Sequence, residues 1–423
     1  MPFSSLGLIP ALVRAVDKAG YAAPTAIQAA AIPAILRGSD VLGAAQTGSG
    51  KTAAYALPLL QALMAPAAGP RQVRALILVP TRELAAQVGQ TVHALAKPLP
   101  IKLKISVLFG GVSINPQMMD LRGGADIVVA TPGRLLDLVR QNAVKLGGVS
   151  LCVLDEADRL LDMGFSEEIN AILALLPGKR QNLFFSATFP DSVQALADSL
   201  LKEPVRIEVA SEAQDKPDIV QRAITVDVPR RTQLLRYLIL QQQWDRVLVF
   251  VATKYAAEHV ADKLQRAGLH VGAFHGEFSQ GTRSQLLADF KAGRLQVLVA
   301  TDVAARGIDI AGLPAVVNYD LPRSAVDYTH RIGRTGRAGE SGTAISFVTA
   351  DSEAHFRLIE NRNDLRIVRE VVAGFEPTEL PAPASPVTDT VNGGVKGARK
   401  SKKDKLREAA AMAAMAAKAA GGN

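Results

Sequence analysis

Short apolar runs alternate with longer, helix-like segments along the chain from Val41 to about Val348. In the first half these runs are Ala75–Val79, Ile105–Phe109, Ile127–Ala130, Leu151–Leu154 and Asn182–Phe185. In the second half they are Arg246–Val251, Val271–Phe274, Val297–Ala300, Ala315–Asn318 and Thr343–Val348. The runs are almost continuously apolar, which is typical of strands that are covered on both faces. The pattern therefore predicts an α/β fold with mostly parallel sheets flanked by helices.

A polar stretch separates the two sets of runs. It spans Glu203–Gln221 and contains Pro204 and Pro217, which favours a linker between two domains. After Phe375 the chain is rich first in proline, then in glycine and lysine, and finally in alanine, a composition that buries too little surface to fold alone. We therefore predict a first domain over 1–208, a linker over 209–220, a second domain over 221–375 and a disordered, flexible basic tail over 376–423. A tail that serves only solubility is the alternative.

The charge of the chain is concentrated at one end. Lys and Arg number 48 against 40 Asp and Glu, and the last 33 residues alone hold eight basic and two acidic residues. This permits a polyanionic partner without requiring one. The first 20 residues lack the pattern of a secretory signal, and the longest uncharged stretch, Thr52–Pro70, contains three prolines. We therefore expect a soluble, cytoplasmic protein without a membrane span.

Few residues suggest redox or metal chemistry. Cys152 is the only cysteine, which excludes an intrachain disulfide and a cluster of thiolate ligands. None of the six histidines has the spacing of metal ligands, so we expect no zinc site. Cys152 lies within an apolar run and Trp244 just before one, and packing is the expected role of both.

The first candidate site is the glycine-rich segment Ala45–Thr52. It departs from the strict phosphate-loop pattern at Ala45, where a glycine is expected. Gly48 and Gly50 allow close approach of the backbone to an anion, and the amides at the start of a helix would face it. Lys51 would then reach the β- and γ-phosphates, and the Thr52 hydroxyl would bind Mg²⁺. A chance glycine-rich turn is the alternative.

The second candidate is an acidic tetrad, Asp155–Asp158, which directly follows the run Leu151–Leu154. A carboxylate at the tip of a buried strand, after a phosphate loop, suits the binding of Mg²⁺. Glu156 would then orient and deprotonate the attacking water. The alternative is an acidic helix N-terminus that is favoured by the helix dipole.

The third candidate is the segment His330–Arg337, which places three arginines in a short, glycine-interrupted loop. These charges repel one another unless an anion lies opposite. Arginine commonly stabilises the transition state of phosphoryl transfer, which is worth about 10³–10⁵ in rate. A solvated basic loop is the alternative.

Together these segments resemble the DEAD-box RNA helicases of superfamily 2, and within that family the compact bacterial RhlE-like group. The family signatures occur in order as Gly20-Tyr21 with Pro24-Thr25 and Ile27-Gln28, Ala45–Thr52, Pro80–Ala85, Gly110-Gly111, Thr131–Arg134, Asp155–Asp158, Ser186–Thr188, Val249–Val251, Ala300–Ile310 and His330–Arg337. Ala26 departs from the family, which usually has proline there. The resemblance implies two tandem RecA-like domains.

The resemblance also implies which residues bind and cleave the nucleotide, with ATP and Mg²⁺ as cofactors. The implied catalytic residues are Lys51, Asp155, Glu156, Arg334 and Arg337. The implied nucleotide-binding residues are Phe3, Gln28, Ala45, Gln46, Thr47, Gly48, Ser49, Gly50, Lys51, Thr52 and Asp309. Gln28 would hydrogen-bond the adenine edge, Phe3 would stack on the ring and Asp309 would meet the ribose. Thr52 and Asp155 would hold Mg²⁺.

RNA is the partner that the resemblance implies. The implied RNA contacts are Arg82, Gly110, Thr131 and Arg134 in the first domain, and Thr253, Arg283, Thr301 and Asp302 in the second. Such contacts go mostly to phosphates and 2′-hydroxyls and do not read the sequence. The alternative for Thr131 and Thr253 is an ordinary residue that ends a strand or caps a helix. Ser186, Thr188 and His330 would couple the nucleotide state to contacts between the domains.

These implications describe an RNA-stimulated ATPase, an RNA helicase whose domains close around ATP and RNA. Stacking costs roughly 1.4 kcal/mol per step in DNA, which favours local, non-processive opening of short duplexes. Family settings include ribosome assembly, RNA decay and cold adaptation, with ribosomal precursors or decay complexes as partners. The alternative function is an ATP-gated RNA clamp or assembly platform. A DNA translocase ranks lower because the Gln28 signature and the acidic tetrad resemble RNA-acting members.

Overall fold

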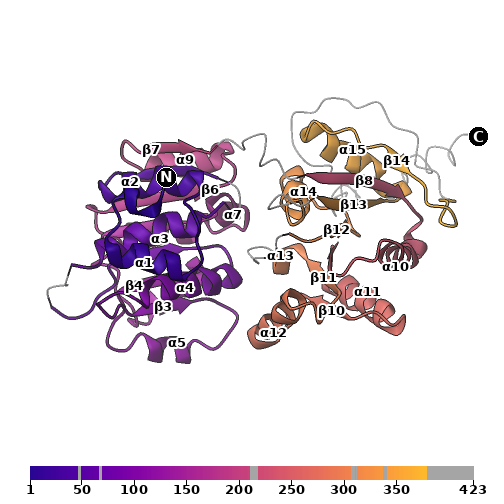
Figure 1. Ribbon diagram of the computed structural model, residues 1–423. Coiled ribbons are helices and arrows are strands. Elements are labelled where there is room, and N and C mark those ends of the chain that lie inside the picture. Colours follow the sequence, from indigo (N-terminus) through magenta and orange to yellow (C-terminus); the bar gives the residue numbers. More distant parts are fainter. Residues whose placement is uncertain are drawn as a thin grey trace, which may run out of the picture. The chain divides into compact units, whose positions relative to one another are not determined.

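The computed structural model describes residues 1–45, 49–65, 69–209, 218–305, 310, 312–336 and 341–378. These residues form two seven-stranded sheets, one in each of two domains (Figure 1). Every strand pairing within the two sheets is parallel. The predicted fold class is therefore confirmed. Among the described helices, none is long and apolar enough to cross a membrane.

The first sheet has the strand order β3-β4-β2-β5-β6-β1-β7. Its strands are β1 (Val41–Ala44), β2 (Ala75–Leu78), β3 (Ile105–Leu108), β4 (Ile127–Ala130), β5 (Leu151–Leu154), β6 (Gln181–Ser186) and β7 (Val205–Glu208). The central strands β4, β2 and β5 are buried at every residue. This explains why their sequences are apolar throughout, since neither face meets water.

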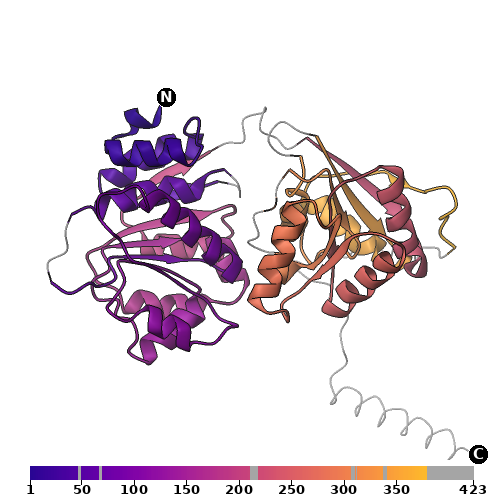
Figure 2. The ribbon, with the colours of Figure 1, turned by 60° about the horizontal axis from the view of Figure 1, so that its bottom comes forward.

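Helices cover both faces of the first sheet (Figure 2). They are η1 (Phe3–Leu6), α1 (Pro10–Lys18), α2 (Ala26–Leu36), α3 (Lys51–Ala62), α4 (Arg82–Ala96), α5 (Asn115–Asp120), α6 (Pro132–Arg140), α7 (Ala157–Asp162), α8 (Ser166–Ala174) and α9 (Asp191–Leu200). Helices α1 to α4 share one apolar cluster with Val153 of β5, whereas α6 to α9 share the other with Cys152. Burial raises the pKa of the Cys152 thiol to about 12, in keeping with the expected packing role.

The second sheet repeats this plan, with the strand order β10-β11-β9-β12-β13-β8-β14. Its strands are β8 (Ile219–Thr225), β9 (Val247–Val251), β10 (Val271–Phe274), β11 (Val297–Thr301), β12 (Ala315–Asn318), β13 (Gly342–Val348) and β14 (Arg369–Glu370). Its helices are η2 (Val228–Arg230), α10 (Arg231–Gln241), α11 (Lys254–Arg266), α12 (Gln280–Lys291), α13 (Asp302–Ala305), α14 (Ala325–Ile332), η3 (Ala350–Ser352) and α15 (Glu353–Arg362). In Figure 1, α10 and α11 lie on one side of this sheet and α12, α13 and α14 on the other. Trp244 packs in the cluster beneath α10 and α11.

The structure differs from the sequence prediction around the polar stretch 203–221. Strand β7 forms within this stretch, and β8 begins at Ile219, two residues before the predicted start of the second domain. Strand β7 could not be predicted from its sequence because it lies at the edge of the sheet, where Arg206 and Glu208 are exposed and break the apolar pattern. The predicted linker, 209–220, therefore overlaps β8 at residues 219 and 220. Residues 210–217 lie outside the described residues.

The last described residue of the predicted tail, Thr378, is bonded to the second domain. Residues 376–378 are described, and the backbone N–H and hydroxyl of Thr378 both donate to the Asp227 carboxylate, at 2.9 and 2.8 Å. Because Asp227 lies just before η2, these residues are attached to the second domain. Residues 379–423 lie outside the described part of the chain.

Candidate functional site

The predicted nucleotide segments of the first domain follow three strands that are neighbours in its sheet. Segment 45–52 follows β1, the tetrad Asp155–Asp158 follows β5, and Ser186–Thr188 comes at the end of β6. These strands are adjacent in the order β5-β6-β1. Because carboxyl ends of parallel strands meet at the same edge of a sheet, three segments distant in sequence come together there.

The predicted RNA contacts of the first domain follow three other strands of the same sheet. Arg82 follows β2, Gly110 follows β3, and Thr131 and Arg134 follow β4. These strands are adjacent in the order β3-β4-β2. The topology therefore places the predicted nucleotide segments and the predicted RNA contacts on neighbouring parts of the carboxyl edge.

The lysine of the predicted phosphate loop is hydrogen-bonded to the residue at which the loop begins. Lys51 is the first residue of α3, and its ammonium donates to the Ala45 carbonyl at 2.7 Å. Gly50 caps the helix with a φ of +91°, a conformation that favours glycine. Ala45 is also held from the next strand, since its N–H donates to the Ser186 carbonyl. Gln46, Thr47 and Gly48 lie outside the described residues.

Gln28 is fully buried and joins its own helix to this loop. Its amide oxygen accepts from the Thr25 N–H at 3.0 Å, and its amide nitrogen donates to the Gly50 carbonyl at 3.1 Å. Phe3, the predicted adenine-stacking residue, is buried with its ring edge-on to Tyr21, at 6.3 Å between centroids. The N-terminal segment is thus packed beside the helix that carries Gln28.

Asp155 is the centre of a buried polar network at the tip of β5. One carboxylate oxygen accepts from the Glu156 N–H at 2.9 Å, and the other accepts from the Tyr55 hydroxyl at 2.9 Å. Burial raises the pKa of the Asp155 carboxyl, and the nearby Lys51 charge opposes this. Burial and the Asp155 charge together raise the pKa of the Tyr55 phenol well above its usual range, so it remains a donor.

Tyr55 was missed by the sequence reasoning. Within the apolar stretch of α3 a tyrosine has the same pattern as a core residue, and nothing local shows which way its hydroxyl points. Glu156, by contrast, was predicted, and the structure adds that it adopts a left-handed conformation with φ +50°. Such backbone strain is concentrated at functional sites. Arg159 lies 3.5 Å from its carboxylate.

The two predicted coupling residues of the first domain are connected to the acidic tetrad. One oxygen of Asp158 accepts from both the N–H and the hydroxyl of Thr188, at 3.0 and 2.9 Å. The Asp158 N–H donates to the Ser186 hydroxyl at 3.2 Å, and that hydroxyl donates to the Thr188 carbonyl at 2.8 Å. These hydrogen bonds join the tetrad to the segment after β6.

The donor set of this site fits a magnesium ion. It offers the Asp155 carboxylate and the Thr52 hydroxyl, both oxygen ligands. No group of three or more His, Cys, Asp or Glu side chains capable of holding a metal occurs among the described residues. Mg²⁺ usually takes one or two protein ligands and completes its shell with phosphates and water.

The second sheet divides its carboxyl edge in the same way. Arg283 lies on the helix after β10, Thr301 and Asp302 lie at the end of β11, and Thr253 follows β9. These strands are adjacent in the order β10-β11-β9. Next comes β12, which leads into α14 with His330 and then Arg334. The predicted RNA contacts and the predicted arginine finger Arg334 thus occupy neighbouring parts of one edge.

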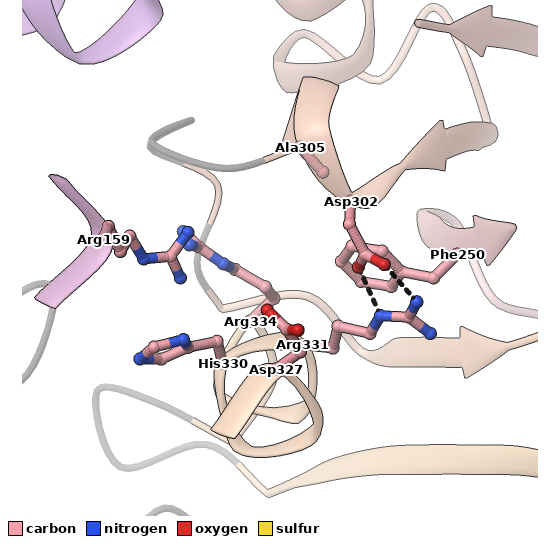
Figure 3. Close-up of a pocket in the computed structure, with 8 residues that line it drawn as sticks. All are labelled: Arg159, Phe250, Asp302, Ala305, Asp327, His330, Arg331 and Arg334. Atoms are coloured by element: carbon pink, nitrogen blue, oxygen red, sulfur yellow. Dashed lines mark hydrogen bonds and ion pairs between the residues drawn. The ribbon is translucent and has the colours of Figure 1, made fainter. Parts of the chain in front are cut away.

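Arg331 has an internal partner in the second domain. Its guanidinium forms a bidentate pair with the Asp302 carboxylate at 2.6 Å for both bonds, and lies 4.8 Å from the centre of the Phe250 ring (Figure 3). His330 and Arg334 point to the opposite side of the helix end in Figure 3. The anion opposite one of the three arginines is therefore a carboxylate of the protein.

Other predicted contacts already have partners within their own domain. The Arg134 guanidinium donates to the Val112 carbonyl at 2.7 Å, and Arg283 donates to the Ala304 carbonyl at 3.3 Å. Thr253 caps α11 by accepting from the Ala256 N–H at 3.1 Å, so the capping alternative describes one real role of this residue. Arg337 and Asp309 lie outside the described residues.

Comparison with known proteins decides the family. The family model "DEAD/DEAH box helicase" matches residues 25–196, and the model "Helicase conserved C-terminal domain" matches residues 230–339. The chain belongs to the DEAD-box RNA helicase family. The two matched ranges contain most of the predicted segments that follow the strands of the two sheets.

Relatives within the DEAD-box family come from distant organisms. The ATP-dependent RNA helicase DeaD of Buchnera aphidicola is 41% identical over 87% of this chain and 60% of its own length. The DEAD-box ATP-dependent RNA helicase CshA of Bacillus cereus is 40% identical over 87% of this chain and 69% of its own length. Both relatives are longer than the part that this chain matches. The RhlE-like grouping stays a prediction.

A solved structure shares the fold. Saccharomyces cerevisiae Dbp5, bound to RNA and ADP BeF3, matches with a TM-score of 0.76 and 31% identity over 88% of this chain and 95% of its own. The match spans both domains, which identifies the two sheets as the tandem RecA-like domains of a DEAD-box protein.

Proposed function

We propose that this DEAD-box protein is an RNA-stimulated ATPase that uses ATP to open or remodel short RNA duplexes and RNA–protein complexes locally. The observation that carries the proposal is the arrangement of the predicted site residues along the carboxyl edges of the two sheets. Each sheet collects its predicted phosphate-binding residues at one part of the edge and its predicted RNA contacts at the neighbouring part. A molecule built in this way can bind both ligands through each domain at once.

In this proposal the first domain recognises the nucleotide. Among the described residues, the Gln28 amide oxygen accepts one hydrogen bond and the amide nitrogen donates one, and an amide side chain offers the acceptor and donor pair that paired contacts to adenine need. Lys51 neutralises the terminal phosphates, and Glu156 orients the attacking water and accepts its proton. Thr52 and Asp155 would hold Mg²⁺, which when bound offsets the charge that develops on the phosphates.

The second domain completes the site in this proposal. Arg334 and Arg337 stabilise the transferring phosphoryl group, and closure therefore depends on the presence of the γ-phosphate. RNA held by residues of both domains favours the same closed form. Linkage then requires ATP and RNA to strengthen each other's binding. The clamp alternative differs in one respect, since RNA would stay bound and unwinding would be incidental.

The resemblance also carries predictions about setting. These are a cytoplasmic location and a place in ribosome assembly, RNA decay or cold adaptation. They do not follow from the geometry of the site, and RNAs crosslinked to the protein in cells would test them.

The decisive experiment measures phosphate release from ATP with and without RNA. We expect RNA to stimulate turnover and DNA to do so far less. Lys51→Ala and Glu156→Gln should abolish the stimulated rate, because one removes charge at the phosphates and the other removes the base at constant size. Lys97→Ala, which alters an exposed lysine at the end of α4, is the matched control and should keep the full rate.

Two outcomes would contradict the proposal. One is retained RNA-stimulated turnover in Lys51→Ala or Glu156→Gln. The other is a rate that RNA leaves unchanged in the unaltered protein. Strand release and RNA residence time, each measured with ATP and with a non-hydrolysable analogue, distinguish the helicase from the clamp.

A further inference from the structure

Tyr55 lies between the two residues that we assign to Mg²⁺. It follows Thr52 by three positions on α3, so the two side chains share one helix face. The Tyr55 hydroxyl donates to the Asp155 carboxylate at 2.9 Å. A single phenol thus connects the start of α3 to the tip of β5.

The position of this phenol is fixed by packing. Tyr55 is fully buried, and its ring lies against Phe185 with 5.5 Å between centroids and 47° between planes. The ring therefore holds its hydroxyl at the carboxylate without needing a mobile side chain. The Asp155 carboxylate is held at its other oxygen by the Glu156 N–H, so both oxygens are oriented by donors.

A phenylalanine ring, which lacks the hydroxyl, would fill the same place in the core. A buried hydroxyl costs free energy unless it is hydrogen-bonded, and its partner here is the one carboxylate assigned to the metal. We propose that Tyr55 is a positioning residue whose hydroxyl orients the Asp155 carboxylate for Mg²⁺ and so strengthens the binding of the Mg²⁺–nucleotide complex. This inference rests on the proposed function, since it names a further residue of the same site.

The expected effect follows from the behaviour of comparable groups. Partners that orient a metal ligand typically contribute 10- to 100-fold in metal affinity or activity. Tyr55→Phe removes only the hydroxyl and keeps the ring against Phe185. Tyr319→Phe is the matched control, because Tyr319 is also buried and its hydroxyl bonds the Thr232 hydroxyl at 2.9 Å in the second domain.

The experiment measures ADP affinity by calorimetry, in Mg²⁺ and in EDTA, for the full chain and both variants. In EDTA we expect the three proteins to agree. In Mg²⁺ we expect Tyr55→Phe to bind ADP on the order of 10-fold more weakly than the other two. The Mg²⁺ concentration that gives half-maximal RNA-stimulated ATPase activity should rise by a similar factor. Equal affinities in Mg²⁺, or equal weakening with and without Mg²⁺, would overturn the inference.

A double-mutant cycle separates orientation of Asp155 from a general effect on the domain. If Tyr55 acts through the carboxylate, Tyr55→Phe should change ADP affinity no further in an Asp155→Asn background. Additive losses would overturn the inference. Absence of Mg²⁺-dependent, RNA-stimulated ATPase activity in the unaltered protein would instead contradict the proposed function, so the two failures are distinguishable.

Discussion

Arg331 carries a charge that the second domain neutralises internally. Besides the bidentate pair with Asp302, its guanidinium donates to the Asn318 side chain at 3.0 Å and to the Asp320 carbonyl at 2.7 Å. These partners come from the ends of β11 and β12, so one side chain joins the predicted RNA contacts to α14. A buried pair of this kind fixes geometry more than it adds stability, but breaking it leaves a charge without its partner.

Arg331→Met should therefore destabilise the second domain. Removal of one partner of a fully buried pair costs about 3–5 kcal/mol, and because the Asp302 side chain is 21% exposed we expect a smaller loss, about 2 kcal/mol. Trp244 is the only tryptophan and lies in the core of this domain, so its fluorescence during urea unfolding reports the change. Arg266→Met is the control.

The control removes an exposed helical pair, Arg266 with Asp262, and should cost at most about 0.5 kcal/mol. Equal unfolding midpoints for Arg331→Met and Arg266→Met would show that the buried pair contributes no more than a surface one.

The chemical role of a single residue could be predicted from the sequence only where that residue belongs to a short local motif. Lys51, Asp155 and Glu156 belong to short motifs with known chemistry, and the structure brings them to one edge. Tyr55 and the partner of Arg331 could not be predicted. Their roles depend on contacts across 100 and 29 positions of the chain, which no local pattern encodes.

At the scale of elements, the entry to α3 depends on a tight approach between the phosphate loop and α2. A Cβ atom added at Gly50 would lie 2.4 Å from the Gln28 amide nitrogen and 3.1 Å from the Thr25 hydroxyl. The helix entry therefore needs glycine for two reasons, its positive φ and the space that Gln28 occupies.

Gly50→Ala should weaken nucleotide binding. The added methyl group displaces the Gln28 amide, and loss of one to two hydrogen bonds corresponds to about tenfold in affinity. Gly268→Ala is the matched control, because Gly268 has a φ of +88° with no heavy atom within 4 Å of the added carbon. It should lose about 1 kcal/mol of stability and keep its affinity for ADP, measured by calorimetry. Similar affinities for the two variants would contradict the steric argument.

Strands that are buried on both faces were predicted within one residue of their ends, as for Ile127–Ala130. Strands β7 and β14, each at one end of its sheet order, were missed, whereas β3 and β10 at the other ends were predicted. In β7 only Ile207 is buried, and its polar neighbours resemble linker residues. An edge strand is defined by its partner β1 rather than by its own composition, so the partner has to be known first.

At the scale of the whole molecule, the two domains have the same sheet order. The predicted nucleotide segments and the predicted RNA contacts alternate along the chain, yet in each domain they follow neighbouring groups of strands. This explains why ATP and RNA are expected to act on both domains together. The excess positive charge of the chain does not come mainly from the two domains, because most of it lies in the last 33 residues.

These last residues should add affinity for RNA without affecting catalysis. The chain is best cut after Thr378, since Thr378 is hydrogen-bonded to Asp227. We expect the shortened protein to bind single-stranded RNA more weakly, with a log–log salt dependence that is shallower by about 0.7 for each RNA phosphate that the protein no longer neutralises. Its maximal ATPase rate at saturating RNA should stay unchanged. A full-length control that replaces the seven basic residues between Lys396 and Arg407 with glutamine separates charge from length. An unchanged slope in both proteins would show that this segment does not bind RNA.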